Sequence, residues 1–242
     1  MRLIAPIRTS ESGANAFLGL ADDDRSYWVK VPGNAQGDTI LSAEQIVSAV
    51  AQLIGAPARE TTLIEIPTDL MGWEYAKFHR LRKGVAHASL LLPAAEESDQ
   101  LIYPKRDNNP SRVPAFFALW DWCMGEDEQW LFDLSGDMSI WTFDHGWWLG
   151  GGPAWDAGSF EQMADRDWHW TAGFTGCDPV AFETVAKRLE QLTPEQILKA
   201  VSHVPAEWDV SNHELESVAW VLYRRRQPVA ERLRELSAKV SS

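Results

Sequence analysis

The stretch ALWDWCMGEDEQWLFDLSGDMSIWTFDHG, residues 118–146, contains an acidic loop followed by two short apolar runs. The runs 130–134 and 139–143 have the aromatic and β-branched content of strands, and the turn-forming residues 135–138 separate them. The pattern predicts an antiparallel β-hairpin. At the open end of such a hairpin, the residues that flank the two strands lie side by side, because paired strands are about 5 Å apart.

Asp127 and Asp144 occupy those two flanking places. Two neighbouring carboxylates repel each other unless a cation or a proton lies between them. Oxygen ligands suit Mg²⁺, which binds one or two protein carboxylates and completes its shell with water and phosphate. The alternatives are structural: Asp127 belongs to an acidic loop that can simply be solvated, and Asp144 follows a strand, where a turn-forming residue is equally typical.

A second stretch, YWVKVPGNAQGDTILSAEQ (27–45), predicts a strand that ends near Lys30, a polar turn, and a helix start that contains Glu44. Taken singly, such a lysine is usually a surface residue, and such a glutamate usually favours the helix dipole. Lys30, Glu44, Asp127 and Asp144 together, in this order, indicate a shared site. In it a strand lysine held by a helix glutamate positions nucleotide phosphates, and the aspartates handle a hydroxyl group and a metal ion.

Residues 1–90 predict a β-rich region with one helix. Apolar residues recur at helical spacing up to Gly55, a natural helix stop, and Ser42 with Gln45 predicts a capping box at the start. The run 61–66 predicts a strand that follows this helix.

The polar, turn-rich residues 93–112 predict the connection between two lobes, 1–92 and 93–242. The second lobe is predicted to be mostly helical, with helices that begin at Pro114, at Asp178-Pro179, at Thr193-Pro194 and at about Asn212, and a last short one from Pro228.

The composition excludes several classes of protein. A net charge of −13 disfavours nonspecific nucleic-acid binding, and the one basic run, at residues 224–226, is predicted to be surface charge near a helix end. Cys123 and Cys177 have no CxxC spacing, which argues against a disulfide framework and a zinc site. This cysteine usage fits a reducing, cytoplasmic setting. No apolar run reaches about 18 residues, so we expect a protein that does not span a membrane.

Residues 27–58, 118–146 and 204–233 together resemble the HipA-like kinase domain family, a bacterial branch of the protein-kinase-like and phosphoinositide-kinase-like fold. The similarity covers nearly the whole chain, and its most specific part is the Asp-His-Gly motif at residues 144–146. It implies an α+β fold of two lobes, a β-rich N-lobe with one helix and a mostly helical C-lobe that carries a catalytic hairpin. ATP and Mg²⁺ are then expected in the cleft between the lobes.

The resemblance also implies a role for each charged residue. Lys30 would contact the α and β phosphates of ATP and pair with Glu44. Asp127 would orient or deprotonate the acceptor hydroxyl, implied by the family to be a serine or threonine of a protein substrate, and Asp144 would hold Mg²⁺.

Two positions around the loop aspartate depart from the family pattern. Phe132 stands where an asparagine usually provides a second metal ligand, and Gln129 is the nearest substitute. Glu128 stands where an arginine often follows the loop aspartate, and it adds negative charge. These departures motivate a second hypothesis, a pseudokinase that binds nucleotide or a protein partner without transferring phosphate.

The glycine-rich phosphate loop is also sparse, because SESGANAFLG (10–19) offers only Gly13 and Gly19. Ser10, Ser12 and the backbone amides around Gly13 and Ala14 are the candidates for contacting the phosphates.

The 13 tryptophans suggest a third hypothesis, an aromatic glycan-binding face. Trp147 and Trp148 are predicted to lie one in the core and one at the rim. The alternative is that they gate the cleft or stack on a substrate. Residues 165–174 are predicted to pack in the core. His145 is interpreted as a spine or hydrogen-bonding residue.

Overall fold

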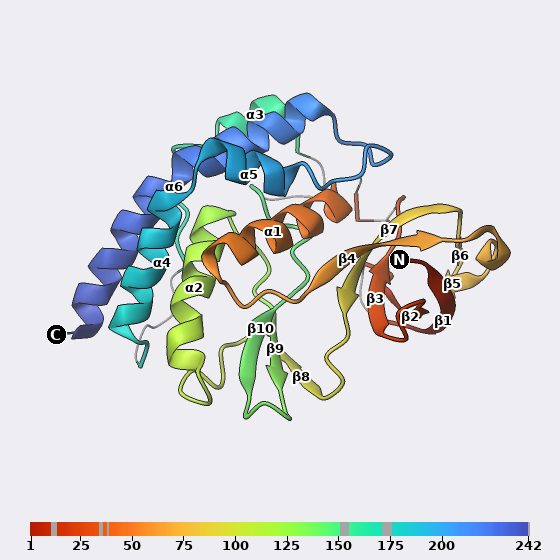
Figure 1. Cartoon of the computed structure of the whole chain (residues 1–242), viewed down its shortest axis with the longest axis horizontal. Helices are drawn as coiled ribbons and strands as arrows, with labels where there is room; N and C mark the ends of the chain where they lie inside the picture. The colour runs from red at the N-terminus through yellow and green to blue at the C-terminus, as the bar shows by residue number, and fades with distance from the viewer. Residues whose placement is uncertain (11–13, 34–35, 38, 151–154, 171–175, 242) are drawn as a thin grey trace.

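The computed structural model describes residues 1–10, 14–33, 36–37, 39–150, 155–170 and 176–241. A β-rich N-terminal part with one long helix precedes a helical C-terminal part that carries a small sheet. Figure 1 shows the larger sheet at one side of the molecule and the C-terminus at the opposite side.

The N-terminal sheet has five antiparallel strands in the order β1-β2-β3-β7-β4. They are β1 (Leu3–Thr9), β2 (Phe17–Ala21), β3 (Ser26–Lys30), β4 (Thr61–Ile66) and β7 (Gly84–Leu90). The sheet is curled, and its two edge strands, β1 and β4, approach each other (Figure 1). Arg2, which precedes β1, forms an isolated bridge with Glu65 of β4. The strands predicted from residues 27–31 and 61–66 are therefore confirmed, the second without a shift.

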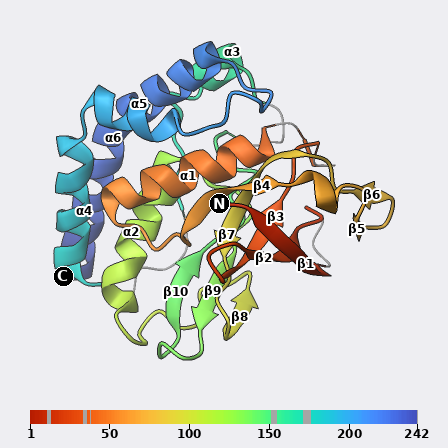
Figure 2. The ribbon, with the colours of Figure 1, turned by 45° about the vertical axis from the view of Figure 1, so that its right-hand side comes forward.

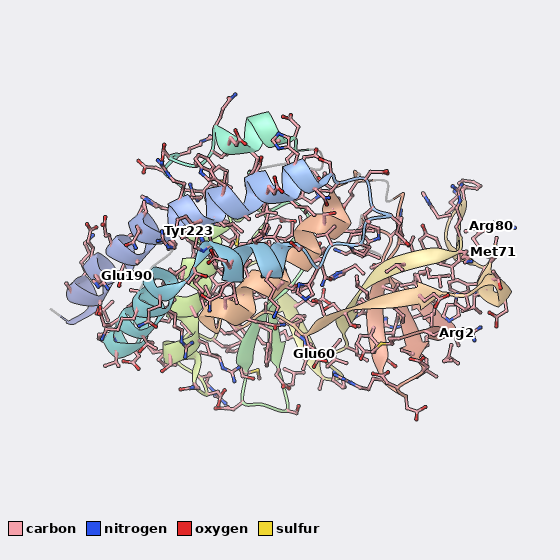
Figure 3. The ribbon with its side chains drawn as sticks, turned by 45° about the horizontal axis from the view of Figure 1, so that its top comes forward. Arg2, Glu60, Met71, Arg80, Glu190 and Tyr223 are labelled. Carbon is pink, nitrogen blue, oxygen red and sulfur yellow. The ribbon has the colours of Figure 1, made fainter. Side chains whose placement is uncertain are left out.

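A small extension lies at the far end of this sheet. It consists of a 3-10 helix (Thr68–Leu70) and the short strands β5 (Glu74–Ala76) and β6 (His79–Arg80). Figure 3 shows Met71, Arg80 and Arg2 there, well away from Glu190 at the helical end of the molecule.

Helix α1 (Ile40–Ile54) passes between the sheet and the other helices (Figures 1 and 2). It begins at Ile40, with Thr39 as N-cap, so the predicted capping box at Ser42 is wrong. Ile40 is fully buried, and the packing it gains favours a helix that starts earlier than the polar signal. Gly55 ends the helix as predicted, in a left-handed conformation with φ 73°.

The predicted hairpin is confirmed by β9 (Trp130–Asp133) and β10 (Ser139–Thr142), which pair antiparallel. A third strand, β8 (Ala95–Ser98), adds to β9 and lies within the polar stretch predicted to be a connection. Its sequence, AEES, has no apolar alternation, so only its pairing with β9 identifies it as a strand.

Helix α2 (Asn109–Trp122) begins five residues before Pro114, which the sequence predicted as its start. A proline inside a helix leaves the carbonyl four residues earlier without a partner. Here that carbonyl, of Pro110, accepts a hydrogen bond of 2.8 Å from the backbone N–H of Asp178. The helix therefore tolerates Pro114 because a distant segment satisfies the free carbonyl.

The remaining helices are α3 (Ala157–Glu161), α4 (Pro179–Gln191), α5 (Pro194–Val201) and α6 (Asn212–Ser241). The starts of α4 and α5 are confirmed, with Asp178 and Thr193 as side-chain N-caps. The predicted break at Pro228 is wrong, because α6 continues through it. Val229 and Leu233 beyond the proline are buried, and Arg234 pairs with Glu190 of α4, so tertiary packing stabilises the second half of the helix. None of the described helices is long and apolar enough to span a membrane.

The three arginines at residues 224–226 do not form the surface cluster that the sequence predicted. Arg225 is only 4% exposed, and its guanidinium donates to the carbonyls of Asp121, Trp122, Met163 and Arg166. It thereby ties α6 to the end of α2 and to the segment after α3.

Candidate active site

A cleft of about 670 Å³ opens between the five-stranded sheet and the β8-β9-β10 sheet. The cleft is lined by the end of β1, the strands β3, β7, β8 and β9, helix α1, and the loops on either side of the hairpin. The residues that line it are Arg8, Thr9, Ser10, Ala16, Trp28, Lys30, Glu44, Arg59, His87, Ser89, Leu90, Leu91, Leu92, Pro93, Ala95, Glu97, Gln129, Leu131, Phe143 and Asp144.

Three of the four charged residues predicted from the sequence meet in this cleft. Lys30 is the last residue of β3 and is only 8% exposed. Its Nζ donates to Oε1 of Glu44, on α1, and to Oδ1 of Asp144 at 2.6 Å. The structure thus brings together a strand, a helix and the loop after β10 through a single ammonium group.

Burial and charge act in opposite directions on these groups. Burial disfavours the Lys30 ammonium, but the Glu44 and Asp144 carboxylates outweigh it and raise the pKa of Lys30 above its ordinary value. Burial raises the pKa of Glu44, whereas Lys30 and nearby histidines lower it. The attractive charges prevail, and the pKa of Glu44 is lowered to about 2. For Asp144, burial and the Glu44 charge outweigh the attraction of Lys30, so its pKa is raised.

Asp144 is the carboxylate of this trio that faces the cleft. Its side chain is 21% exposed, against 4% for Glu44. With one ammonium against two carboxylates, the ionised trio carries a net negative charge, which favours the approach of a cation. Glu44 is therefore suited to holding Lys30, and Asp144 to binding an incoming metal ion.

The residues after Asp144 fix its position. The backbone N–H of His145 donates to Oε2 of Glu44 at 3.0 Å, and the His145 Nε2 is 3.1 Å from the Thr142 hydroxyl oxygen. A Cβ atom at Gly146 would lie 2.8 Å from Ile40 Cγ2, so α1 packs too closely here for any larger residue. Each residue of the Asp-His-Gly motif thus has its own contact, and His145 is a hydrogen-bonding residue, as predicted.

Two buried histidines beside the trio make stability depend on pH. Burial lowers the pKa of His87 and of His145 to about 4, from 6.5. The unfolded chain then binds more protons between these values, so stability is full above about pH 6.5 and falls as the pH approaches about 4. Each histidine contributes a slope of about 1.4 kcal/mol per pH unit in that window.

We therefore expect His87→Gln to reduce the slope of the unfolding free energy against pH by about 1.4 kcal/mol per pH unit, the contribution of one of the two histidines. Urea unfolding at several pH values between about 4.5 and 6.5 measures the slope. His213→Gln, at an exposed position, is the control and should leave it unchanged. An unchanged slope in His87→Gln would show that this imidazole is not buried in its neutral form.

Asp127 lies on the exposed loop before β9, in a left-handed conformation with φ 55°. Its Oδ2 accepts a hydrogen bond of 2.7 Å from Nε2 of Gln129, and Gln129 lines the cleft together with Asp144. Asp127 is not itself part of the cleft wall. It adjoins the wall through Gln129, whose amide oxygen is not used in that bond.

These residues fit a magnesium ion that is shared with a nucleotide. The described residues contain no group of three or more histidine, cysteine, aspartate or glutamate side chains able to enclose a metal ion. Mg²⁺ does not need such a cage, because it commonly takes one or two carboxylates and completes its shell with phosphate and water. Asp144 would hold it, with the Gln129 amide oxygen as a second protein ligand.

The predicted phosphate-loop residues have mixed outcomes. Ser12 and Gly13 lie outside the described residues. Ser10 lines the cleft, and Ala14 is buried. Gly19 cannot serve as a loop glycine, because it lies in the middle of β2, where a Cβ atom would be 2.5 Å from Leu3 Cδ1.

Other predicted positions are settled by burial. Trp148 is 1% exposed and Trp147 is 38% exposed, which confirms one core and one rim residue. Phe132 is fully buried and packs edge-on against Tyr103, so its side chain belongs to the core. Of the segment 165–174, predicted to pack in the core, Trp170 is buried and Trp168 is half-buried, whereas residues 165–167 and His169 are exposed. Residues 171–174 lie outside the described residues.

Sequence reasoning missed Arg59. It is 8% exposed, lines the cleft, and donates from Nε and Nη2 to the carbonyl oxygen of Leu90 at 3.3 and 3.1 Å. Its guanidinium lies over the Trp141 ring, and the backbone N–H of Arg59 donates to the carbonyl of Thr142, two residues before Asp144. Arg59 therefore links the end of β7 to the hairpin, and no local pattern in the sequence around it indicates this.

A β-sheet part and a helical part, joined at a cleft where a strand lysine, a helix glutamate and an Asp-His-Gly loop meet, define the class of protein-kinase-like folds. A family model described as HipA-like kinase matches residues 4–132. This match covers more than half of the chain, and the chain belongs to the HipA-like kinase family.

Solved structures show the same fold. The Helicobacter pylori proinflammatory kinase CtkA matches with a TM-score of 0.65 at 12% identity, over 99% of this chain and 96% of that one. A Golgi casein kinase matches with a TM-score of 0.56 at 10% identity, over 97% of this chain and 72% of that one, and the Golgi casein kinase with Mn/ADP bound matches with a TM-score of 0.54. No curated protein sequence matches the chain.

Proposed function

We propose that this protein is an ATP- and Mg²⁺-dependent phosphotransferase that transfers the γ-phosphate to a serine or threonine hydroxyl of a protein substrate. The observation that carries the proposal is the contact of Lys30 with both Glu44 and Asp144 in a cleft of nucleotide size. Membership of the HipA-like kinase family supports it, as does the Mn/ADP complex of the similarly folded Golgi casein kinase. Residues 1–92 would supply the phosphate-binding lysine, and residues 93–242 the catalytic loop and the metal ligand.

Lys30 is prepared to bind phosphate. Its ammonium keeps its proton at neutral pH, because Glu44 and Asp144 raise its pKa against the effect of burial. When nucleotide binds, Asp144 can exchange its contact with Lys30 for the metal ion, while Glu44 keeps the ammonium oriented toward the phosphates. Mg²⁺ would neutralise phosphate charge and hold the β and γ phosphates in line with the acceptor. The apolar cleft residues Leu91 and Leu92 offer a surface for the base.

Asp127 is the group placed to act on the acceptor. It is exposed, so a protein hydroxyl can reach it, and the Gln129 amide fixes one of its oxygens. The other oxygen remains available to accept the hydroxyl hydrogen and align the acceptor oxygen. Because the reaction needs mainly positioning and charge neutralisation, these few groups suffice.

A nucleotide-binding pseudokinase is the second candidate. The observation that favours it is the burial of Phe132 in the core, which removes the usual second metal ligand from the loop. Such a protein would bind ATP in the same cleft through Lys30 and Asp144, with no transfer to any acceptor.

Asp127→Ala separates the two candidates. We expect this change to lower ATP consumption in the presence of cell lysate as acceptor by about 100-fold or more, because a positioned base contributes that much. Its affinity for ATP should change little, since Asp127 is not in the cleft wall. Glu126→Ala, on the same loop, is the control and should stay near the wild-type rate. Equal consumption by Asp127→Ala and wild type would remove Asp127 from the mechanism, and ATP binding without transfer by the wild type would favour the pseudokinase.

A further inference from the structure

Glu128, the residue after Asp127, has an unexpected pair of partners. Its Oε1 accepts a hydrogen bond of 2.5 Å from the indole N–H of Trp130, and its Oε2 accepts one of 3.0 Å from the indole N–H of Trp170. Both carboxylate oxygens are thus engaged by uncharged donors. The Glu128 carboxylate, which adds negative charge beside the expected triphosphate site, is hydrogen-bonded to two tryptophan side chains.

The two tryptophans belong to different parts of the chain. Trp130 is fully buried and is the first residue of β9. Trp170 lies 42 residues after Glu128, in the segment between α3 and α4, and is 4% exposed. The backbone of Trp170 is held as well, because its N–H donates to Oδ1 of Asp121 at 2.8 Å and its carbonyl accepts from Arg232 at 2.9 Å. Glu128 therefore connects the hairpin to a firmly anchored segment.

The loop that carries Asp127 needs such anchors. Met124 and Asp127 both have positive φ values, 51° and 55°, a conformation that disfavours L side chains. A third tryptophan, Trp168, donates to the carbonyl of Gly125 at 2.9 Å. Trp168 thus holds the start of the loop at Gly125, and Trp170 and Trp130 hold its end at Glu128.

We propose that Glu128 is a positioning residue that holds Asp127 in the geometry required for the acceptor hydroxyl, and that it makes this geometry depend on the docking of Trp170. The proposal rests on the phosphotransferase function proposed above. Glu128 does not touch the nucleotide cleft, so it acts on the acceptor side of the reaction and not on ATP binding.

Glu128→Gln tests the contact with almost no change of shape. The two indoles donate to different carboxylate oxygens, and glutamine replaces one of those oxygens with an NH₂ group, so one indole N–H then faces another donor. We expect kcat to fall by about 10-fold or more, with KM for ATP within about twofold of wild type. Glu126→Gln, on the same loop, is the matched control and should leave both values unchanged.

Trp170→Phe completes a double-mutant cycle. It removes one of the two indole N–H groups, so the glutamine of the double variant can turn its oxygen toward Trp130 and its NH₂ group meets no indole donor. Glu128→Gln/Trp170→Phe should therefore be no slower than Glu128→Gln, although Trp170→Phe alone reduces kcat. Effects that multiply independently would show that the two side chains are not coupled and would overturn the dependence on Trp170.

The indole N–H resonances in a ¹H–¹⁵N spectrum provide a readout that does not require activity. Glu128→Gln should shift the signals of Trp130 and Trp170, the latter assigned by its loss in Trp170→Phe. The signal of Trp122, whose indole donates to the carbonyl of Leu222, should stay in place. Unchanged signals for Trp130 and Trp170 would overturn the contact. If the wild type is active and Glu128→Gln shifts the signals but leaves kcat unchanged, only the positioning role is overturned. A wild type that transfers no phosphate would overturn the proposed function and the positioning role with it.

Discussion

Lys30→Met is expected to lower the rate of phosphate transfer by about 100- to 1000-fold, the largest effect of any single change on activity. The substitution keeps the length of the side chain but removes the only cation in contact with Glu44 and Asp144 among the described residues. The phosphates then lose their protein cation, and Asp144 loses the partner that balances it. A phosphate-transfer assay at saturating ATP measures the effect.

The same variant should also be less stable. Two buried carboxylates would face each other without a cation, a situation that typically costs about 3–5 kcal/mol. Repulsion raises the pKa of one carboxyl in the folded state, so the deficit relative to wild type should shrink as the pH falls toward about 5. Lys77→Met, on an exposed turn, is the control for both measurements. Wild-type transfer by Lys30→Met would refute its assigned role.

Arg225→Met is expected to reduce stability by about 3–5 kcal/mol, because a buried charged donor with several partners is removed. Its guanidinium donates to four carbonyls, at distances of 2.6 to 3.2 Å. Methionine fills similar space but leaves those carbonyls without this partner. For a chain of this size the loss corresponds to a fall in Tm of roughly 10 °C.

Arg224→Met is the matched control for this prediction. Arg224 is exposed, and its ion pair with Asp165 at 2.8 Å lies on the surface, where such pairs contribute about 0–1 kcal/mol. Thermal unfolding of the two variants gives the comparison. Equal shifts in Tm would mean that the buried contacts of Arg225 contribute no more than a surface pair.

The parts of the fold that could be predicted from the sequence are those set by local signals. The β9-β10 hairpin follows from two strand-like runs and a turn, and the starts of α4 and α5 follow from an N-cap residue before a proline. The errors at Pro114 and Pro228 have a common cause. Each proline signals a helix start locally, but distant contacts, such as the bond from Asp178 to the Pro110 carbonyl, let the helix pass through it.

In the candidate active site, too, some residues could be predicted from the sequence and others could not. The order of Lys30, Glu44, Asp127 and Asp144 along the chain could be related to a known family, and the structure joins the first two with the last. Arg59 and the indole contacts of Glu128 depend on side chains from separate segments, and neither produces a periodic pattern. Gly19 was misjudged for a related reason, since close packing against Leu3 and loop flexibility both favour glycine.

The central claim, that Lys30 and Asp144 bind a metal-bound nucleotide, is tested most directly by a crystal structure with Mn²⁺ and a non-hydrolysable ATP analogue. We predict an anomalous manganese peak about 2.1 Å from a carboxylate oxygen of Asp144, with phosphate oxygens within about 3 Å of the Lys30 ammonium. A nucleotide bound outside the cleft, or no manganese peak at Asp144 with the nucleotide in place, would contradict the account.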